Sequence, residues 1–174
     1  MKKFVLITLA LILALSLCAC GGDNGSSKDS TKPTAGCDKG PGEAIGYTFT
    51  TGGTQFGVNM DAKKVVEKLG SYNDRAVSES CGDMGGNDIN YFYANFTIYA
   101  NDAEGYERIY CIELTSDVEA TEKNVCIGDT ADAVKSAYGT PSKETSVGLI
   151  YEKDGMSLTF MLENGAVSSI QYYG

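Results

Sequence analysis

The side chains that most often carry out catalysis in small proteins are scarce in this chain. It contains no histidine, which removes the commonest general base and the commonest zinc ligand together. It does contain six cysteines and 23 acidic residues. Thiol chemistry, calcium binding and paired-carboxylate hydrolysis are therefore the kinds of chemistry to consider.

The acidic and glycine-rich stretches lack the spacing that such sites require. The loop from Asp83 to Asp88 lacks the alternating Asp order and the terminal Glu of a calcium loop, so a polar turn explains it better. Neither Gly52-Gly53 nor Gly85-Gly86 is followed by the Lys-Ser/Thr of a phosphate-binding loop. A hydrolase with an acid pair is the least favoured class, because no two carboxylates lie in a recognisable motif. We expect no catalytic residue, no metal site and no cofactor.

The first residues have the organisation of a secretory leader. A basic Met1-Lys2-Lys3 start is followed by an apolar run of 14 residues at 4–17. At about 1.5 Å per residue a helix of this length reaches roughly 21 Å, short of the roughly 30 Å hydrocarbon layer. We therefore expect residues 1–19 to be a signal peptide and not a membrane-spanning helix.

The leader ends in a motif that points to lipid attachment. The sequence Leu17-x-Ala-Cys20 resembles the lipobox of bacterial lipoproteins. That resemblance implies that Cys20 receives a diacylglyceryl group and becomes the first residue of the mature chain. Two alternatives are a plain secretory signal and lipidation of Cys18, which would place Leu17 at a cleavage position that favours small residues.

The segment after the leader has the composition of a tether. Residues 20–45 are rich in Gly, Ser and Pro and nearly devoid of apolar side chains, so they cannot bury enough surface to offset the entropy lost on ordering. Without residues 1–19 the net charge changes from −9 to −11. This charge disfavours nucleic acid and anionic membrane surfaces as partners.

The rest of the chain contains two segments with matching apolar patterns. An offset of 69 residues places Gly70 on Gly139, and five apolar positions align between the two segments. These positions are Phe56, Val58, Ala62, Val65 and Leu69 in the first, and Val125, Ile127, Ala131, Val134 and Tyr138 in the second. We expect two repeats, at 46–117 and 118–174, although two amphipathic helices can also match this well by chance.

Each repeat is expected to hold one short amphipathic helix. The apolar stripes run from Ala62 to Leu69 and from Ala131 to Tyr138, with Gly70 and Gly139 as terminators. Asn59 and Asp129 are the expected N-caps. Both helices are too short to be stable alone, so each must lie on an apolar surface.

The strands that supply this surface are predicted from alternating apolar residues. Hairpin turns are expected at Ala94-Asn95, at the Asp154-Gly155 turn and at Asn164-Gly165. The predicted strands lie at 91–93, 96–99, 107–115, 149–151, 157–162 and 166–173. The fold class is therefore α+β, with two helix-plus-antiparallel-meander repeats and the helices on one face of the sheet.

Two stretches of the sequence resemble a known family. The segment 121–139 (TEKNVCIGDTADAVKSAYG) and the pattern Tyr-x-x-Asp-Gly-x-x-Leu-x-Phe from Tyr151 to Phe160 resemble the tandem-repeat modules of β-lactamase-inhibitor-protein-like proteins. The Ser80-Cys81 region through Asp88, followed by Tyr91-x-Tyr93, is similar to clostridial lipoproteins of that sort. Such modules occur in secreted and lipid-anchored bacterial proteins.

The resemblance, which covers roughly residues 46–174, implies a specific architecture. It implies one curved, eight-stranded antiparallel sheet with helices on its convex side and an open concave side for protein contacts. It also implies an extracytoplasmic location on a Gram-positive surface. No loops matching those that bind β-lactamase are present, so inhibition of that enzyme is not implied.

Strand alternation predicts which side chains lie on each face of the sheet. The residues expected to face the helices are Tyr91, Tyr93, Phe96, Ile98, Ile112, Leu114, Leu158, Phe160, Leu162, Ala166, Ile170 and Tyr172. Those expected on the open face are Phe92, Thr97, Tyr99, Cys111, Glu113, Ser157, Thr159, Met161, Gln171 and Tyr173. This mixture of aromatic and small polar residues is typical of a recognition surface, and equally of an ordinary half-solvated sheet face.

The remaining cysteines are consistent with an exported protein. Besides Cys18 and Cys20 there are Cys37, Cys81, Cys111 and Cys126, which allow three disulfide pairings. We expect Cys111–Cys126, because these residues flank a chain return, and then Cys37–Cys81. Free buried thiols are the alternative. A zinc site is disfavoured, since no Cys-x-x-Cys pair occurs.

These observations favour a binding protein over an enzyme. The leading hypothesis is a lipid-anchored extracytoplasmic module that recognises or inhibits a protein through the open sheet face. The second is an envelope assembly or structural lipoprotein, similar in shape to small outer-membrane assembly lipoproteins with an α-α-β-β-β core. The identity of a partner does not follow from the sequence.

Overall fold

The computed structural model describes residues 42–82 and 85–174. The predicted signal peptide, Cys20, Cys37 and the predicted tether up to residue 41 lie outside the described residues. The elements, in chain order, are β1 (Phe49–Thr51), β2 (Thr54–Phe56), α1 (Ala62–Leu69), β3 (Asp74–Glu79), β4 (Asn87–Phe92), β5 (Phe96–Asn101), β6 (Arg108–Leu114), α2 (Ala131–Tyr138), β7 (Lys143–Thr145), β8 (Gly148–Lys153), β9 (Met156–Glu163) and β10 (Ala166–Tyr173). No helix in this part of the chain is long and apolar enough to span a membrane.

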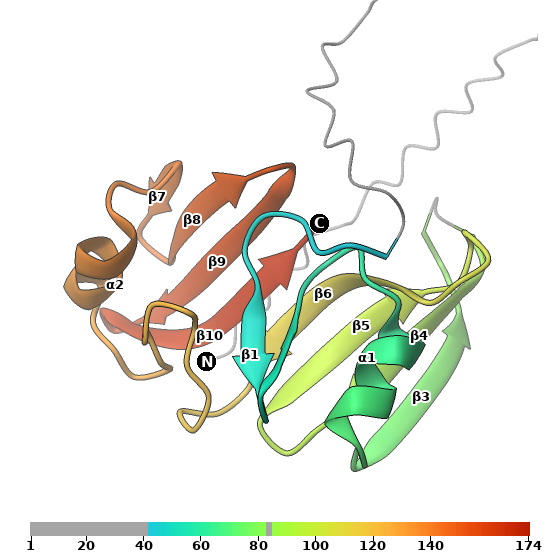
Figure 1. Cartoon of the computed structure of the whole chain (residues 1–174). Helices are drawn as coiled ribbons and strands as arrows, with labels where there is room; N and C mark the ends of the chain where they lie inside the picture. The colour runs from blue at the N-terminus through green and yellow to red at the C-terminus, as the bar shows by residue number, and fades with distance from the viewer. Residues whose placement is uncertain (1–41, 83–84) are drawn as a thin grey trace, which may run out of the picture. The chain divides into compact units, whose positions relative to one another are not determined.

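Eight strands form one antiparallel sheet in the order β3-β4-β5-β6-β10-β9-β8-β7, and β1 pairs separately with β2 (Figure 1). Each helix is followed by a four-stranded meander. The two meanders join where β10 pairs with β6, with Ile170 opposite Leu114. The predicted α+β class with an antiparallel sheet is confirmed. The element order does not contain an α-α-β-β-β core, since four strands separate the helices.

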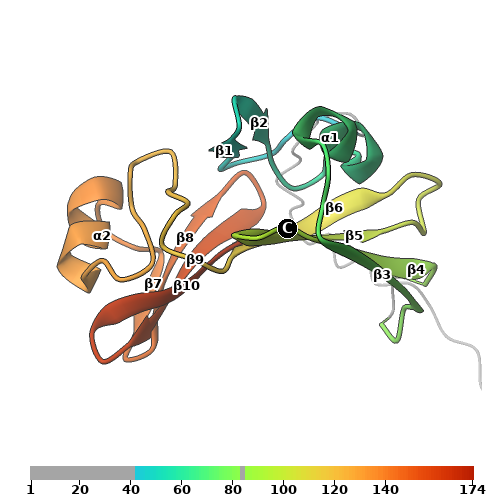
Figure 2. The same ribbon diagram turned by 90° about the horizontal axis from the view of Figure 1, so that it is seen from below.

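The apolar core lies between the sheet and the elements that cover one of its faces. Both helices and the β1–β2 hairpin lie on the same side of the sheet (Figure 2). The helices contribute Ala62, Val65 and Val134 to the core, and the hairpin contributes Phe49 and Phe56. The sheet contributes the inward side chains of its strands, including Ile98, Ile112, Leu158, Phe160, Ile170 and Tyr172. We call this side of the sheet the inner face.

The inner face differs from the prediction at one end of β10. Ala166 was expected to face the core, but Val167 is the buried residue there. The pairing of β10 with β9 shifts between Val167 and Ser169, so Ser168 is an extra residue in the ladder. Such a bulge reverses the alternation on one side of it, which strict period-two counting cannot anticipate.

The N-caps of the two helices lie two residues and one residue after the expected positions, respectively. The side chain of Asp61 accepts a hydrogen bond from the Lys63 amide and caps α1, where Asn59 was predicted. Asn59 instead has a positive φ of 73° before the helix begins.

In α2 the cap is Thr130, where Asp129 was predicted. Thr130 Oγ1 accepts from the Ala133 amide at 3.2 Å. The carboxylate of Asp129 is already used, since it accepts from the Cys126 amide at 2.8 Å. Asp129 therefore closes the turn that precedes the helix and leaves the capping to its neighbour.

Both helices end at a glycine in the same unusual conformation. Gly70 has φ 81° and ψ −150°, and Gly139 has φ 84° and ψ −150°. We expect Gly70→Ala and Gly139→Ala each to lower the free energy of unfolding by about 1–3 kcal/mol, because this region is accessible almost only to glycine. A Cβ at either position would meet no neighbour within 4 Å, so backbone strain alone carries the effect.

Urea denaturation of the two variants measures this cost. Gly82→Ala is the control, since Gly82 has no positive φ and an added Cβ would meet only Ser80 Oγ at 3.9 Å. The control should stay within about 0.5 kcal/mol of the parent chain. A cost at Gly139 no larger than that of the control would contradict the prediction.

Candidate functional site

The face of the sheet opposite the helices, which we call the outer face, carries all the side chains predicted for it. The strand register aligns them in rows across the sheet. One row runs Phe92, Thr97, Glu113, Gln171 and Thr159. The next runs Tyr99, Cys111, Tyr173 and Ser157, and Met161 lies opposite Ser169. No described helix or hairpin covers these rows (Figure 2).

Three tyrosines form a cluster on the outer face. The ring of Tyr110 lies between those of Tyr99 and Tyr173, with centroid distances of 6.3 Å to each. Tyr173 is 55% exposed, and Met161, elsewhere on this face, is 38% exposed. The cluster therefore offers aromatic surface to an incoming molecule.

Tyr110 was not among the predicted residues. The pairing of β5 with β6 shifts between Tyr99 and Ala100, so that Tyr110 is the extra residue of a bulge in β6. Its ring joins Tyr99 and Tyr173, although simple alternation would have placed it on the inner face with Ile112. Within β6, Ile109 and Ile112 are both fully buried although they lie three residues apart, so the bulge interrupts the alternation there.

A carboxylate lies beside the tyrosine cluster. Glu113 Oε2 accepts a hydrogen bond from the Tyr99 hydroxyl at 2.9 Å. Glu113 Oε1 accepts from Ser169 Oγ and from Gln171 Nε2, both at 3.1 Å. Donors from β5 and β10, the two neighbours of β6, thus hold one carboxylate of β6 in a fixed orientation.

The hydroxyl of Tyr99 remains a donor over a wide pH range. Burial, and then the hydrogen bond to Glu113, raises the pKa of Tyr99 to about 12. Deprotonation would place two negative charges side by side in a partly desolvated position. At neutral pH the pair therefore consists of a neutral phenol and the carboxyl group that it orients.

The thiols differ from the predicted disulfide pattern. Cys111 and Cys126 are free in the structure, so the expected Cys111–Cys126 bridge is absent from it. The register explains why, since Cys111 is flanked on the outer face by Tyr99 and Tyr173. Cys126 instead forms a β-bridge with Ala120. Cys81 is exposed, and its predicted partner Cys37 lies outside the described residues.

Cys111 is expected to resist thiol reagents. It is 8% exposed, and burial followed by the charge of Glu113 raises its pKa to about 12. The thiolate is the reactive form, so at pH 8 almost none is present. In variants that keep a single cysteine, we expect Cys81 to react with a chromogenic disulfide reagent at least about 100-fold faster than Cys111. Comparable rates for the two thiols in the folded protein would contradict this.

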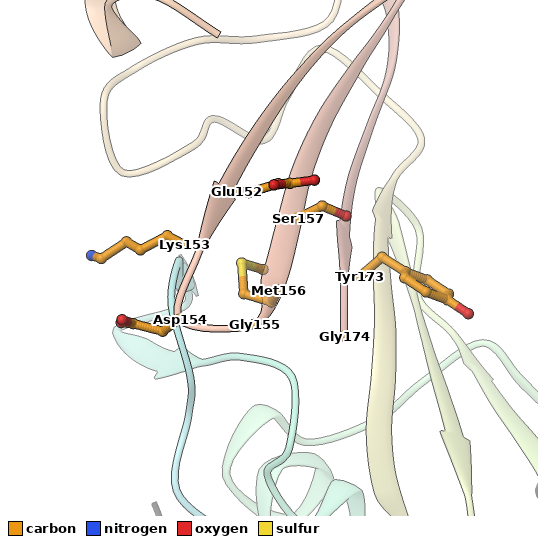
Figure 3. Close-up of a pocket in the computed structure, with 8 residues that line it drawn as sticks. All are labelled: Glu152, Lys153, Asp154, Gly155, Met156, Ser157, Tyr173 and Gly174. Atoms are coloured by element: carbon orange, nitrogen blue, oxygen red, sulfur yellow. The ribbon is translucent and has the colours of Figure 1, made fainter. Parts of the chain in front are cut away.

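A groove adjoins the outer face at the end of the β8–β9 hairpin. It encloses about 470 Å³ and is lined by Glu152, Lys153, Asp154, Gly155, Met156, Ser157, Tyr173 and Gly174. Glu152, Ser157 and Tyr173 share one cross-strand row and project to one side, whereas Lys153 points to the other (Figure 3). The groove is therefore continuous with the tyrosine cluster through Tyr173.

The described residues provide few features for other chemistry. Within residues 42–82 and 85–174, no group of three or more His, Cys, Asp or Glu side chains is arranged to hold a metal ion. In the predicted polar loop, the carboxylate of Asp88 accepts a hydrogen bond from Asn101 Nδ2 at 2.9 Å. The outer face, with its adjoining groove, is left uncovered by the described elements (Figure 2).

Comparison of the chain with protein-family models, with curated proteins and with solved structures found no match.

Proposed function

We propose that this chain is a lipid-anchored extracytoplasmic binding module that recognises or inhibits a protein through the outer face of its sheet. The observation that carries the proposal is the cluster of Tyr99, Tyr110 and Tyr173 on a face that no described element covers. Tyrosine combines a large contact area with a hydroxyl and few rotatable bonds, so it is enriched at protein interfaces.

The arrangement of the two halves supports a tandem-repeat origin of the β-lactamase-inhibitor-protein-like type. The helices Ala62–Leu69 and Ala131–Tyr138 coincide residue for residue at the offset of 69 found in the sequence. Their terminating glycines share one conformation, and each helix precedes a four-stranded meander. We propose that the two repeats form one curved sheet whose outer face is the concave, protein-binding side.

The anchoring part of the proposal rests on the leader and on Cys20, which lie outside the described residues. Mass spectrometry of the mature N-terminus should find a diacylglyceryl adduct on Cys20. Cys20→Ser should abolish the adduct and release the protein from the membrane fraction, whereas Cys18→Ser should leave both unchanged. An unmodified mature N-terminus would reject anchoring without affecting the proposed role of the outer face.

Site-specific photocrosslinking in cells tests the role of the outer face. A photoreactive phenylalanine analogue at Tyr173 or Thr159 samples this face, and the same analogue at Lys64 or Glu67 samples exposed positions on α1. We expect both outer-face positions to yield the same protein adduct and the α1 positions to yield none.

Two results would overturn the proposal. One is the same adduct from both sides of the sheet, which would indicate unspecific collision. The other is an internal crosslink from Tyr173 or Thr159 to residues 20–41, which would show that the chain covers its own outer face. Melting temperatures close to that of the parent chain would confirm that the crosslinking variants are folded.

A further inference from the structure

The carboxylate of Glu113 lies beside the tyrosine cluster on the outer face, where neutral groups hold it. Its three hydrogen-bond donors are a phenol, an alcohol and an amide, all of them neutral. They orient the carboxylate without neutralising it. No ion pair in the described residues involves Glu113.

This carboxylate retains acceptor capacity. A carboxylate offers about four lone-pair positions, and three donors bind here, two to Oε1 and one to Oε2. A further donor can therefore approach Oε2 without displacing any of them. A charged donor would form a stronger hydrogen bond than the neutral ones already present.

Aromatic rings lie beside this charge. Tyr99 donates to Glu113, and its ring lies 6.3 Å from the ring of Tyr110 between centroids. The ring of Tyr110 in turn lies 6.3 Å from that of Tyr173. The faces of such rings attract cations. A cation bound to Glu113 could therefore place its apolar stem or its planar group against the tyrosine cluster.

Two further acidic residues lie near the tyrosine cluster, and Lys153 of the adjoining groove points to the other side of the sheet (Figure 3). Asp88 is close enough to Tyr110 that its charge, after burial, raises the pKa of that tyrosine. Glu152 lines the adjoining groove and lies in the same cross-strand row as Tyr173. Along the row that contains Glu113, the only basic residue of the described strands is Lys143, in the edge strand β7.

We propose that the outer face binds an arginine side chain of a partner protein, with the guanidinium donating to Glu113 and stacking on Tyr99 and Tyr110. The inference rests on the proposed function, since it assumes that the outer face is the docking surface. Arginine fits better than lysine, because a planar guanidinium can stack on a phenol ring while it donates to a carboxylate. An ammonium group can act there only as a point charge.

Fluorescence anisotropy with a labelled hexa-arginine peptide tests this proposal. The chain from Cys20 to Gly174 is suitable, since it contains the whole described core. Glu113→Gln should weaken binding about tenfold, and Tyr110→Leu about three- to tenfold. Hexa-lysine should bind more weakly than hexa-arginine, and hexa-citrulline, which has arginine's shape without its charge, should bind weakest.

Glu67→Gln is the matched control, because it removes the same charge from an exposed position on α1. It should change the affinity less than twofold. A larger loss of affinity in Glu113→Gln then cannot be explained by the lower net negative charge alone. Equal losses for the two variants would overturn the proposal, as would equal binding of the arginine and citrulline peptides. Gln at position 113 can still accept the hydrogen bond of Tyr99, and thermal melting verifies that the variant is folded.

The inference and the proposed function can fail separately. A partner crosslinked through Tyr173 or Thr159 whose crosslinked segment contains no arginine, together with weak peptide binding, would overturn only the arginine site. Peptide binding that depends on Glu113, with no crosslinked partner in cells, would instead count against the proposed function.

Discussion

Replacing Phe49 with alanine is expected to lower the free energy of unfolding by about 3–5 kcal/mol, a large part of the stability of a domain of this size. Phe49 is fully buried. Its ring contacts Phe56 at 5.5 Å, Phe96 at 5.4 Å and Tyr172 at 6.1 Å between centroids. Alanine would leave a cavity among three rings that cannot collapse easily.

Phe49 packs against strands of both meanders, so its replacement is expected to destabilise the whole sheet. Phe96 belongs to β5 and Tyr172 to β10, which are the two neighbours of β6 in the sheet. One ring of the β1–β2 hairpin therefore packs across the junction of the two meanders. The register that aligns Tyr99, Cys111 and Tyr173 on the outer face spans the same junction.

Guanidinium denaturation monitored by circular dichroism measures the effect. Thr50→Ala is the control on the same hairpin, because Thr50 is exposed, and it should change stability by less than about 0.5 kcal/mol. Phe49→Leu should cost less than Phe49→Ala, since it refills part of the volume. A loss below about 1 kcal/mol for Phe49→Ala would mean that the β1–β2 hairpin does not stabilise the junction of the two meanders.

Glu107→Ala is expected to cost about 2–3 kcal/mol, the second largest effect. Glu107 is only 4% exposed and accepts a hydrogen bond from the Tyr91 hydroxyl at 2.6 Å. Arg75 Nη2 and Lys63 Nζ approach its Oε1 at 3.2 and 3.4 Å. Alanine would leave the O–H donor of Tyr91 without its acceptor, at a typical cost of about 1–3 kcal/mol. Both cations can return to solvent, which keeps the total below that of a fully buried ion pair.

A double-mutant cycle separates these contributions. Tyr91→Phe removes the hydroxyl that Glu107→Ala would leave without a partner. The double variant should therefore be more stable than the sum of the two single losses predicts, by about 1 kcal/mol or more. Strict additivity would show that the hydrogen bond contributes nothing measurable.

Glu107 and Glu113 show how two carboxylates on opposite sides of one sheet can serve different roles. Glu107 is buried against two cations and ties α1, through Lys63, to β3 and β4. Glu113 is only partly buried and has neutral donors alone. The first is satisfied within the fold, whereas the second retains the charge on which the proposed arginine site depends.

Some elements could be predicted because their signals are local. Both helices were located by their apolar spacing and their terminating glycines, and β5, β9 and β10 by alternation and hairpin turns. The side chains expected on the outer face share that face because a strand with one buried face alternates regularly, whereas their role in binding stays a prediction. The edge strands β3 and β7 were missed, since every one of their residues is exposed and no apolar alternation marks them.

The sequence by itself determined the α+β class, the two helices and the common face of the ten side chains predicted to share it, because each depends on spacing within a few residues. Only the tertiary structure decided the caps Asp61 and Thr130, the bulges at Tyr110 and Ser168, and the free state of Cys111. A cap depends on which turn the tertiary fold closes, and a bulge on how two distant strands accommodate each other's twist. The tyrosine cluster and the neutral donors of Glu113 exist only after strands far apart in sequence have paired, so no local pattern could reveal them.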